Sequence, residues 1–152
     1  MLVALIAAGV ASAVTYAVTR GSGGGHQAGG SQPSASVYSA QQVADAKAAV
    51  CQAADTSARG RTGLGGIRDA NGHLNIELAL RSLNSVVAVE HALSSSPATP
   101  PDVADAARAY IDATLKLTSG GAGDLPTDQL TAINDTANNS IFHLIDVCGL
   151  PR

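Results

Sequence analysis

The sequence has no tryptophan and few aromatic residues of any kind, with three tyrosines and one phenylalanine among 152 residues. Charged residues make up only 14% of the chain, and from residue 38 onward eight Lys and Arg stand against twelve Asp and Glu. A protein that binds nucleic acid needs a basic surface, often with aromatic platforms for the bases. We therefore expect no nucleic-acid partner and no surface that grips anionic lipid headgroups.

Sequence motifs of known catalytic or metal chemistry are also missing. The chain has neither the H-E-x-x-H zinc motif nor the G-x-S-x-G nucleophile elbow. His73 and Glu77 stand four residues apart, which would place them on one helix face, but a solvated pair explains that spacing better than a metal site. Glu90, His91 and His143 lie far apart in the sequence, and no pattern brings them together. We predict no enzyme, no metal and no cofactor.

Long hydrophobic runs occur once, within residues 1–20. Residues 2–18, LVALIAAGVASAVTYAV, carry no charge. As a helix they would extend about 25 Å, close to the roughly 30 Å core of a bilayer. This predicts a transmembrane anchor with the rest of the chain outside the cytoplasm. The alternative is a cleaved signal peptide, because Ala11-Ser12-Ala13 fits a small-residue cleavage site, and the product would then be secreted.

Glycine and serine dominate residues 21–37, which we interpret as a linker. A coil of 16 such residues has a typical end-to-end distance of about 22 Å. The glycines there lack the Gly-Lys-Ser/Thr that would complete a phosphate-binding loop. The sequence thus divides into an anchor or signal segment at 1–20, a linker at 21–37 and a domain at 38–152.

The domain carries four segments with helical periodicity and no alternating strand pattern. Ser39 and Gln42 form a capping box for the first segment, which ends before Gly60. Thr99 is the expected cap of the third segment, and Gly120-Gly121 its expected end. The expected helices span residues 38–59, 74–93, 99–119 and 125–148. We predict an all-α fold, a four-helix antiparallel bundle.

Alanine, leucine, valine and isoleucine are the expected core residues of this bundle, joined by Tyr38, Tyr110 and Phe142. The second helix has an apolar face broad enough to contact two neighbouring helices. That face comprises Leu74, Ile76, Leu78, Ala79, Leu80, Leu83, Val86, Val87, Val89 and Leu93.

Three arginines flank a glycine-rich loop expected at residues 60–72. Arg59, Arg61 and Arg68 are candidate contacts for an anion or an acidic partner. A solvated loop without a ligand accounts for the same residues and is the simpler interpretation.

The two cysteines lie on the apolar sides of the first and last helices. Cys51 follows Val50, and Cys148 continues the apolar series of the fourth helix. In an up-and-down bundle those helices are neighbours, so we predict a disulfide bond between Cys51 and Cys148, typical of an oxidising compartment. The alternative is a pair of buried thiols that never bond. Neither cysteine has the spacing of a metal or redox motif.

The stretches YSAQQVADAKAAVCQA and PATPPDVADAARAYID, followed by a last helix that ends in cysteine, resemble the uncharacterised Ala-rich exported proteins of mycobacteria and related actinobacteria. The resemblance covers most of residues 38–152. It implies a membrane segment, a linker and a helical domain closed from cysteine to cysteine, but no activity. We expect a non-enzymatic, membrane-tethered interaction or scaffolding module with an envelope protein as partner. The alternative is a small protein that binds an apolar ligand such as a lipid.

Overall fold

The structure is a computed structural model that describes residues 37–59 and 65–151. These residues form four helices, α1 (Ala40–Arg59), α2 (Ile76–Ser94), α3 (Pro101–Ala122) and α4 (Thr127–Cys148). Among them no β-strand occurs, and one isolated bridge joins Arg68 to Leu74. The all-α prediction is therefore confirmed. The predicted anchor and most of the predicted linker lie outside the described residues.

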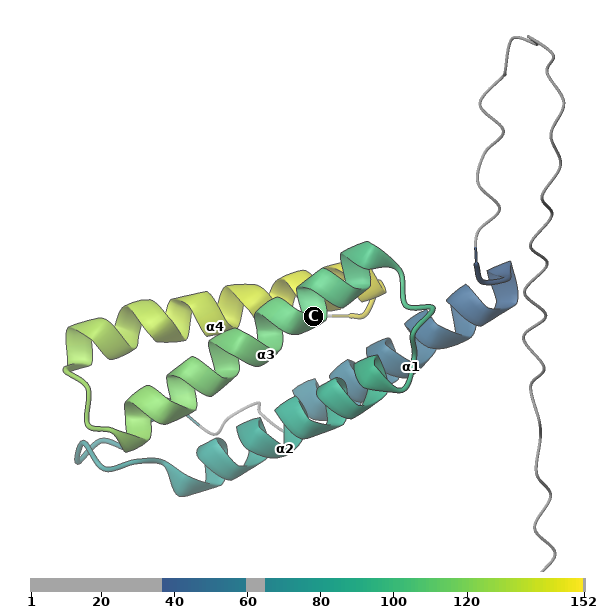
Figure 1. The fold of residues 1–152 in the computed structure, drawn as a ribbon. Helices are drawn as coiled ribbons and strands as arrows, with labels where there is room; N and C mark the ends of the chain where they lie inside the picture. Colours follow the sequence, from purple (N-terminus) through teal and green to yellow (C-terminus); the bar gives the residue numbers. More distant parts are fainter. Residues whose placement is uncertain (1–36, 60–64, 152) are drawn as a thin grey trace, which may run out of the picture. The chain divides into compact units, whose positions relative to one another are not determined.

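Each helix packs against its neighbours in the sequence, and α1 also packs against α4, so the four helices form a ring (Figure 1). The α3–α4 contact is the most extensive of these and the α1–α4 contact the smallest, while the backbones of α2 and α4 do not approach each other closely. Successive helices run in opposite directions, as predicted. Within the described residues, no helix combines the length and the apolar composition that crossing a bilayer demands.

Local sequence explains how the helices begin and end. The Gln42 amide donates to Ser39 Oγ at 3.2 Å, and the Ser39 amide donates to Gln42 Oε1 at 2.8 Å. This confirms the predicted capping box. Asn75 caps α2 by accepting a bond from the Leu78 amide at 3.1 Å. Gly149 ends α4 with φ +67°, a conformation that glycine adopts without steric cost.

Two predicted boundaries were wrong. Thr99 does not cap α3, because its hydroxyl donates to the Ser96 carbonyl at 2.7 Å, and Pro100 takes the cap position without a side-chain bond. The glycines Gly120 and Gly121 do not stop α3 but lie inside it, both buried. They are helical because the space beside them is filled by neighbouring side chains, so that close packing outweighs their low helix propensity.

The core has two clusters along the length of the bundle. One, at the disulfide end, draws on all four helices and includes Tyr110 and Leu144, both fully buried. The other contains residues of α2, α3 and α4 together with Ile67, which belongs to the segment before α2. No residue of α1 takes part in this second cluster. The segment around Ile67 therefore fills a position that α1 leaves empty at that end.

The aromatic residues do not share the core as predicted. Among the aromatic residues that the structure describes, Tyr110 alone is fully buried, and its hydroxyl forms a hydrogen bond with Ser85 across the interior. Phe142 is 44% exposed, and Tyr38 is half-buried beside the start of α1. Alanine and valine supply most of the remaining packing, and alanine allows helix axes to approach closely.

A disulfide bond joins Cys51 to Cys148 and confirms the predicted pairing, with the two Cα atoms 5.5 Å apart. It links the middle of α1 to the last residue of α4, across the smallest of the four contacts between neighbouring helices. The bond closes a loop with a sequence separation of 97 residues.

Replacing both cysteines by alanine is expected to lower the free energy of unfolding by about 2–5 kcal/mol, because the unfolded chain regains the entropy of a long open loop. Urea unfolding, followed by far-UV circular dichroism, measures the change. Wild-type protein unfolded in reductant serves as the control and should show the same loss. Equal stability of the oxidised wild type and the double variant would contradict a stabilising role.

The two helical glycines differ in what a methyl group would meet. At Gly121 an added Cβ would lie 2.7 Å from Ile67 Cγ1, whereas at Gly120 the nearest atom is Leu125 Cδ1 at 2.9 Å. The Leu125 methyl is at the end of a flexible side chain and can rotate away, but Ile67 Cγ1 is held near the backbone. We expect Gly121→Ala to cost about 1–3 kcal/mol by overpacking. Gly120→Ala is the matched control and should be nearly neutral, since alanine favours helix; chemical denaturation distinguishes the two.

Candidate functional site

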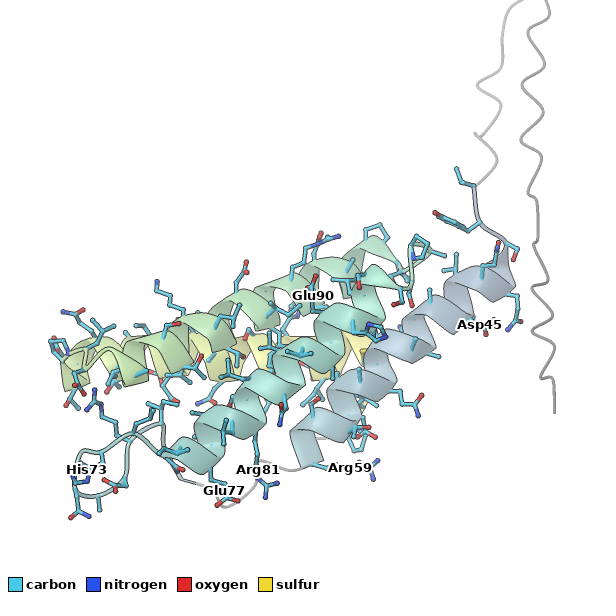
Figure 2. The ribbon with its side chains drawn as sticks, turned by 60° about the horizontal axis from the view of Figure 1, so that its bottom comes forward. Asp45, Arg59, His73, Glu77, Arg81 and Glu90 are labelled. Atoms are coloured by element: carbon cyan, nitrogen blue, oxygen red, sulfur yellow. A yellow bond between two sulfur atoms is a disulfide. The ribbon has the colours of Figure 1, made fainter. Side chains whose placement is uncertain are left out.

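The predicted arginine site begins with Arg59 in the last turn of α1. Its guanidinium donates two hydrogen bonds to the Asp55 carboxylate, at 3.0 and 2.6 Å. These bonds hold the pKa of the Asp55 carboxyl below its usual value and raise the pKa of Arg59. The Arg59 side chain remains largely exposed (Figure 2). Its charge is thus partly neutralised within its own helix before any partner arrives.

Arg68 has a different environment. Its guanidinium donates to the Gly72 carbonyl at 2.8 Å, to the Gly121 carbonyl at 3.2 Å and to Asp124 Oδ1 at 3.0 Å. The side chain is only 21% exposed. It therefore connects the segment before α2 to the end of α3. Arg61, the third predicted residue, lies outside the described residues, and binding of an anion by the three arginines stays a prediction.

Replacing Arg68 by methionine tests this connecting role. The variant keeps an apolar stem but loses all donors, which leaves the partly buried Gly121 carbonyl without this partner. We expect a loss of about 1–3 kcal/mol in stability by urea denaturation. Asp124→Asn is the control. Asp124 is 87% exposed, so removing its charge should change stability by less than about 1 kcal/mol. A similar loss in both variants would show that the surface ion pair is the main contribution.

The histidine and acid pairs considered in the sequence are not assembled into a site. The Asp69 carboxylate accepts bonds from the backbone amides of His73 and Asn71, at 2.9 and 2.8 Å, and these bonds lower its pKa. His73 Nδ1 also lies 3.7 Å from Asp69 Oδ2. Glu77 instead pairs with Arg81 at 2.9 Å, so His73 and Glu77 have separate partners.

Glu90 and His91 lie near the end of α2, whereas His143 lies on α4, whose backbone does not approach that of α2 closely. All three side chains are exposed. Across the described residues, no group of three or more histidine, cysteine, aspartate or glutamate residues is placed to hold a metal ion.

The outer face of α2 is apolar. Ile76, Leu80, Leu83 and Val87 are between 39% and 66% exposed. Their spacing of four, three and four residues aligns them along one side of the helix, and we call them the α2 stripe. It is the spacing of the apolar seam in a coiled coil. Part of the apolar face that the sequence assigned to helix contacts is therefore directed to solvent.

The inner face of α2 is built from smaller residues, which explains this orientation. Its buried positions are Ala79, Ser82, Ser85, Val86 and Val89. Ser85 faces inward because its hydroxyl bonds to the buried hydroxyl of Tyr110, and small side chains let α2 lie close to its neighbours. The long aliphatic residues consequently remain outside. Ser82 and Ser85, which interrupt the aliphatic residues of α2, are the sequence signal from which this orientation could have been predicted. Hydrophobicity alone did not show which side of the helix is buried.

The charged residues beside the stripe are Glu77 and Arg81 on one side and the exposed Glu90 on the other. Glu77 and Arg81 form an ion pair one turn apart, and Figure 2 shows both directed away from the bundle. Asn84 continues the same side of the helix. The Glu77–Arg81 side of the stripe can therefore contact an apolar partner without bringing an unpaired charge into the interface.

A pocket of about 360 Å³, open to solvent, lies among α2, α3, α4 and the segment before α2. Its wall combines aliphatic side chains with hydroxyl and carboxamide groups. The lining residues are Gly65, Gly66, Leu78, Ser82, Thr114, Leu117, Asn134, Ala137 and Asn138. The sequence analysis selected none of Ser82, Thr114, Asn134 and Asn138. These residues lie on three different helices, so the sequence does not show that they line one pocket.

A comparison of the chain with protein families, characterised proteins and solved structures gave no match. The geometry of the described residues is therefore the basis for the proposals below.

Proposed function

We propose that this chain is a non-enzymatic interaction module, tethered to the outer face of a membrane, and that the α2 stripe is its docking surface. The observation that supports this is the exposure of four large aliphatic side chains in one line on α2. Most exposed apolar residues on soluble proteins are scattered singly, and contiguous ones mark interaction sites. The tether and the location follow from the sequence of residues 1–37.

The occupant that fits best is the stripe of a second copy. An apolar helix face with four-three-four spacing pairs with another of the same spacing. The Glu77–Arg81 pair places one charge of each sign beside the stripe, so a second copy meets no net repulsion at that point. In a symmetric dimer each copy presents the same patch to the other.

The energy of such a contact is modest. Full burial of an aliphatic side chain contributes about 1.5–3 kcal/mol, and roughly half of that remains available for each residue of the stripe. Two copies together would gain about 6–12 kcal/mol, against an association cost of about 4–15 kcal/mol. We therefore expect a reversible dimer of micromolar affinity or weaker. Tethering to one membrane would raise the effective concentration and favour the dimer.

A lipid tail between the helices, the other occupant considered from the sequence, has less support. The cavity in the described part of the bundle is lined by Ser82, Thr114, Asn134 and Asn138 as well as by aliphatic groups. An alkyl chain would leave those polar groups without hydrogen bonds, which is unfavourable.

Leu80→Glu is expected to abolish dimerisation, because it places a charge at the centre of the stripe. Its stability should change by no more than about 0.5 kcal/mol, since Leu80 is already more than half exposed. Sedimentation velocity of residues 36–152, a compact unit that holds all four helices and the disulfide, measures association into the millimolar range.

Phe142→Glu is the matched control, because Phe142 is similarly exposed but lies on α4 and not on the helix that carries the stripe. This variant should dimerise as the wild type does. A wild-type domain that stays monomeric throughout the concentration range would rule out the second copy as occupant. Equal loss of association in both variants would rule out the α2 stripe as the contact.

A further inference from the structure

The turn before α2 carries the single Asn-Gly step of the chain, Asn71–Gly72. The backbone reverses direction there, between Arg68 and Leu74, which form an isolated antiparallel bridge. Both residues of the step are exposed. Gly72 has φ +84°, and a Cβ added to it would meet no atom within 4 Å. The step therefore lies in open space at a position that favours glycine.

The carboxamide of Asn71 is available for reaction. The Asn71 backbone amide donates to Asp69 Oδ1 at 2.8 Å, but its side chain makes no hydrogen bond in the part of the chain that the structure describes. Asparagine is one of the thermolabile residues of proteins, because the backbone nitrogen of the next residue can attack Cγ and close a succinimide ring. A side chain on that next residue hinders the approach, and glycine has none.

One hydrogen bond of the turn opposes this attack. The Gly72 amide donates to the Asp69 carbonyl at 3.0 Å, so that bond must open before the nitrogen can reach Cγ. The Asp69 carboxylate supports the same turn through the amides of Asn71 and His73. Exposed turns open locally at a much lower free-energy cost than buried helices do. The bonds to Asp69 therefore slow the reaction without excluding it.

The other asparagines lack this combination. The Asn75 side chain caps α2 by accepting from the Leu78 amide at 3.1 Å, and it donates to the Gly66 carbonyl at 3.2 Å. The rest lie inside helices, where the following amide donates to the carbonyl one turn earlier. They are Asn84, Asn134, Asn138 and Asn139, and none of them precedes a glycine.

We infer that Asn71 is a site of self-modification, at which the Gly72 nitrogen attacks the Asn71 carboxamide and water is the second reactant. The bond from the Gly72 nitrogen to Cγ forms, the Cγ–Nδ2 bond breaks, and ammonia leaves with the proton that Gly72 gives up. Water then opens the succinimide. Cleavage of the bond to Cγ leaves aspartate, and cleavage of the bond to the main-chain carbonyl leaves isoaspartate.

The isoaspartate product disturbs the connection that Arg68 makes. The Arg68 guanidinium donates to the Gly72 carbonyl at 2.8 Å and to the Gly121 carbonyl at 3.2 Å. Isoaspartate carries the main chain through Cβ and Cγ, and the additional carbon displaces the Gly72 carbonyl. The modification thus weakens the attachment of the segment before α2 to the end of α3. None of these residues belongs to the α2 stripe, so the inference does not rest on the proposed dimer.

Peptide mapping by mass spectrometry of the aged, disulfide-bonded protein tests the site. Trypsin releases residues 69–81, a peptide that contains both Asn71 and Asn75. We expect Asn71 alone to convert, into aspartate and isoaspartate forms that chromatography separates, and to convert faster as the pH rises because the deprotonated nitrogen is the nucleophile. No conversion of Asn71, or conversion of Asn75 or of a helical asparagine at the same rate, would overturn the inference.

Two variants test the chemistry and the turn. Asn71→Gln keeps a carboxamide but needs a larger ring that closes more slowly, so residue 71 should stay unmodified. Asp69→Ala removes the acceptor of two amides and should speed the conversion of Asn71 by about threefold or more, since the turn opens more often. Conversion of the glutamine at the wild-type rate, or an unchanged or slower rate in Asp69→Ala, would contradict the proposed route.

Urea unfolding separates the effects of the two products. Protein enriched in isoaspartate should unfold at a lower urea concentration than fresh protein, because Arg68 loses its contact with Gly72. Asn71→Asp carries the same added charge on a normal backbone at an exposed position and should unfold as fresh wild type does. An equal loss in both proteins, or no loss in either, would refute the effect on the Arg68 connection.

Discussion

The covalent link between Cys51 and Cys148 is the constraint on which the arrangement of the four helices depends. It joins α1 to α4, the neighbouring pair with the smallest contact. The connection from α1 to α2 is also the longest of the three, residues 60–75, compared with six residues before α3 and four before α4. Noncovalent packing therefore secures α1 chiefly through α2. The disulfide supplies the second attachment that closes the ring.

Helix α1 does not extend to the end of the bundle opposite the disulfide, and this determines which residues form the core there. Because α1 contributes nothing to the second core cluster, Ile67 belongs to it instead and Leu74 packs against it. A segment of this kind covers three helices less completely than a fourth helix would. The cavity among α2, α3 and α4 lies beside Gly65 and Gly66. The absence of α1 from this end thus gives the bundle both a smaller core and a space that is lined by polar groups.

The residue types on α2 divide its inner and outer faces in an unusual way. Long aliphatic residues face solvent, while serines face the interior and one of them bonds to Tyr110. Stability alone does not favour this distribution, since burying the stripe would be worth several kcal/mol. Proteins keep such exposed surfaces where another molecule covers them.

Helical periodicity was enough to predict the four helices, and the positions of Cys51 and Cys148 were enough to predict their bond. Local chemistry also predicted the capping box at Ser39. The sequence failed where tertiary packing decides between alternatives. Gly120 and Gly121 remain helical because α4 and Ile67 need the space, and no short-range pattern encodes that requirement.

Most of the candidate site could not be predicted from the sequence, for the same reason. The apolar residues of α2 form one broad face, and only the Ser85–Tyr110 bond determines which edge of it is buried. Of the predicted arginines, Arg68 is committed to the segment before α2 and to the end of α3, a role that spacing could not reveal.

The position of the disulfide has a further consequence for durability. All three connections between helices, residues 60–75, 95–100 and 123–126, fall between Cys51 and Cys148. A protease that severs any one of them leaves two fragments still joined through sulfur. Such a nicked molecule keeps its pieces at high local concentration and can hold its packing.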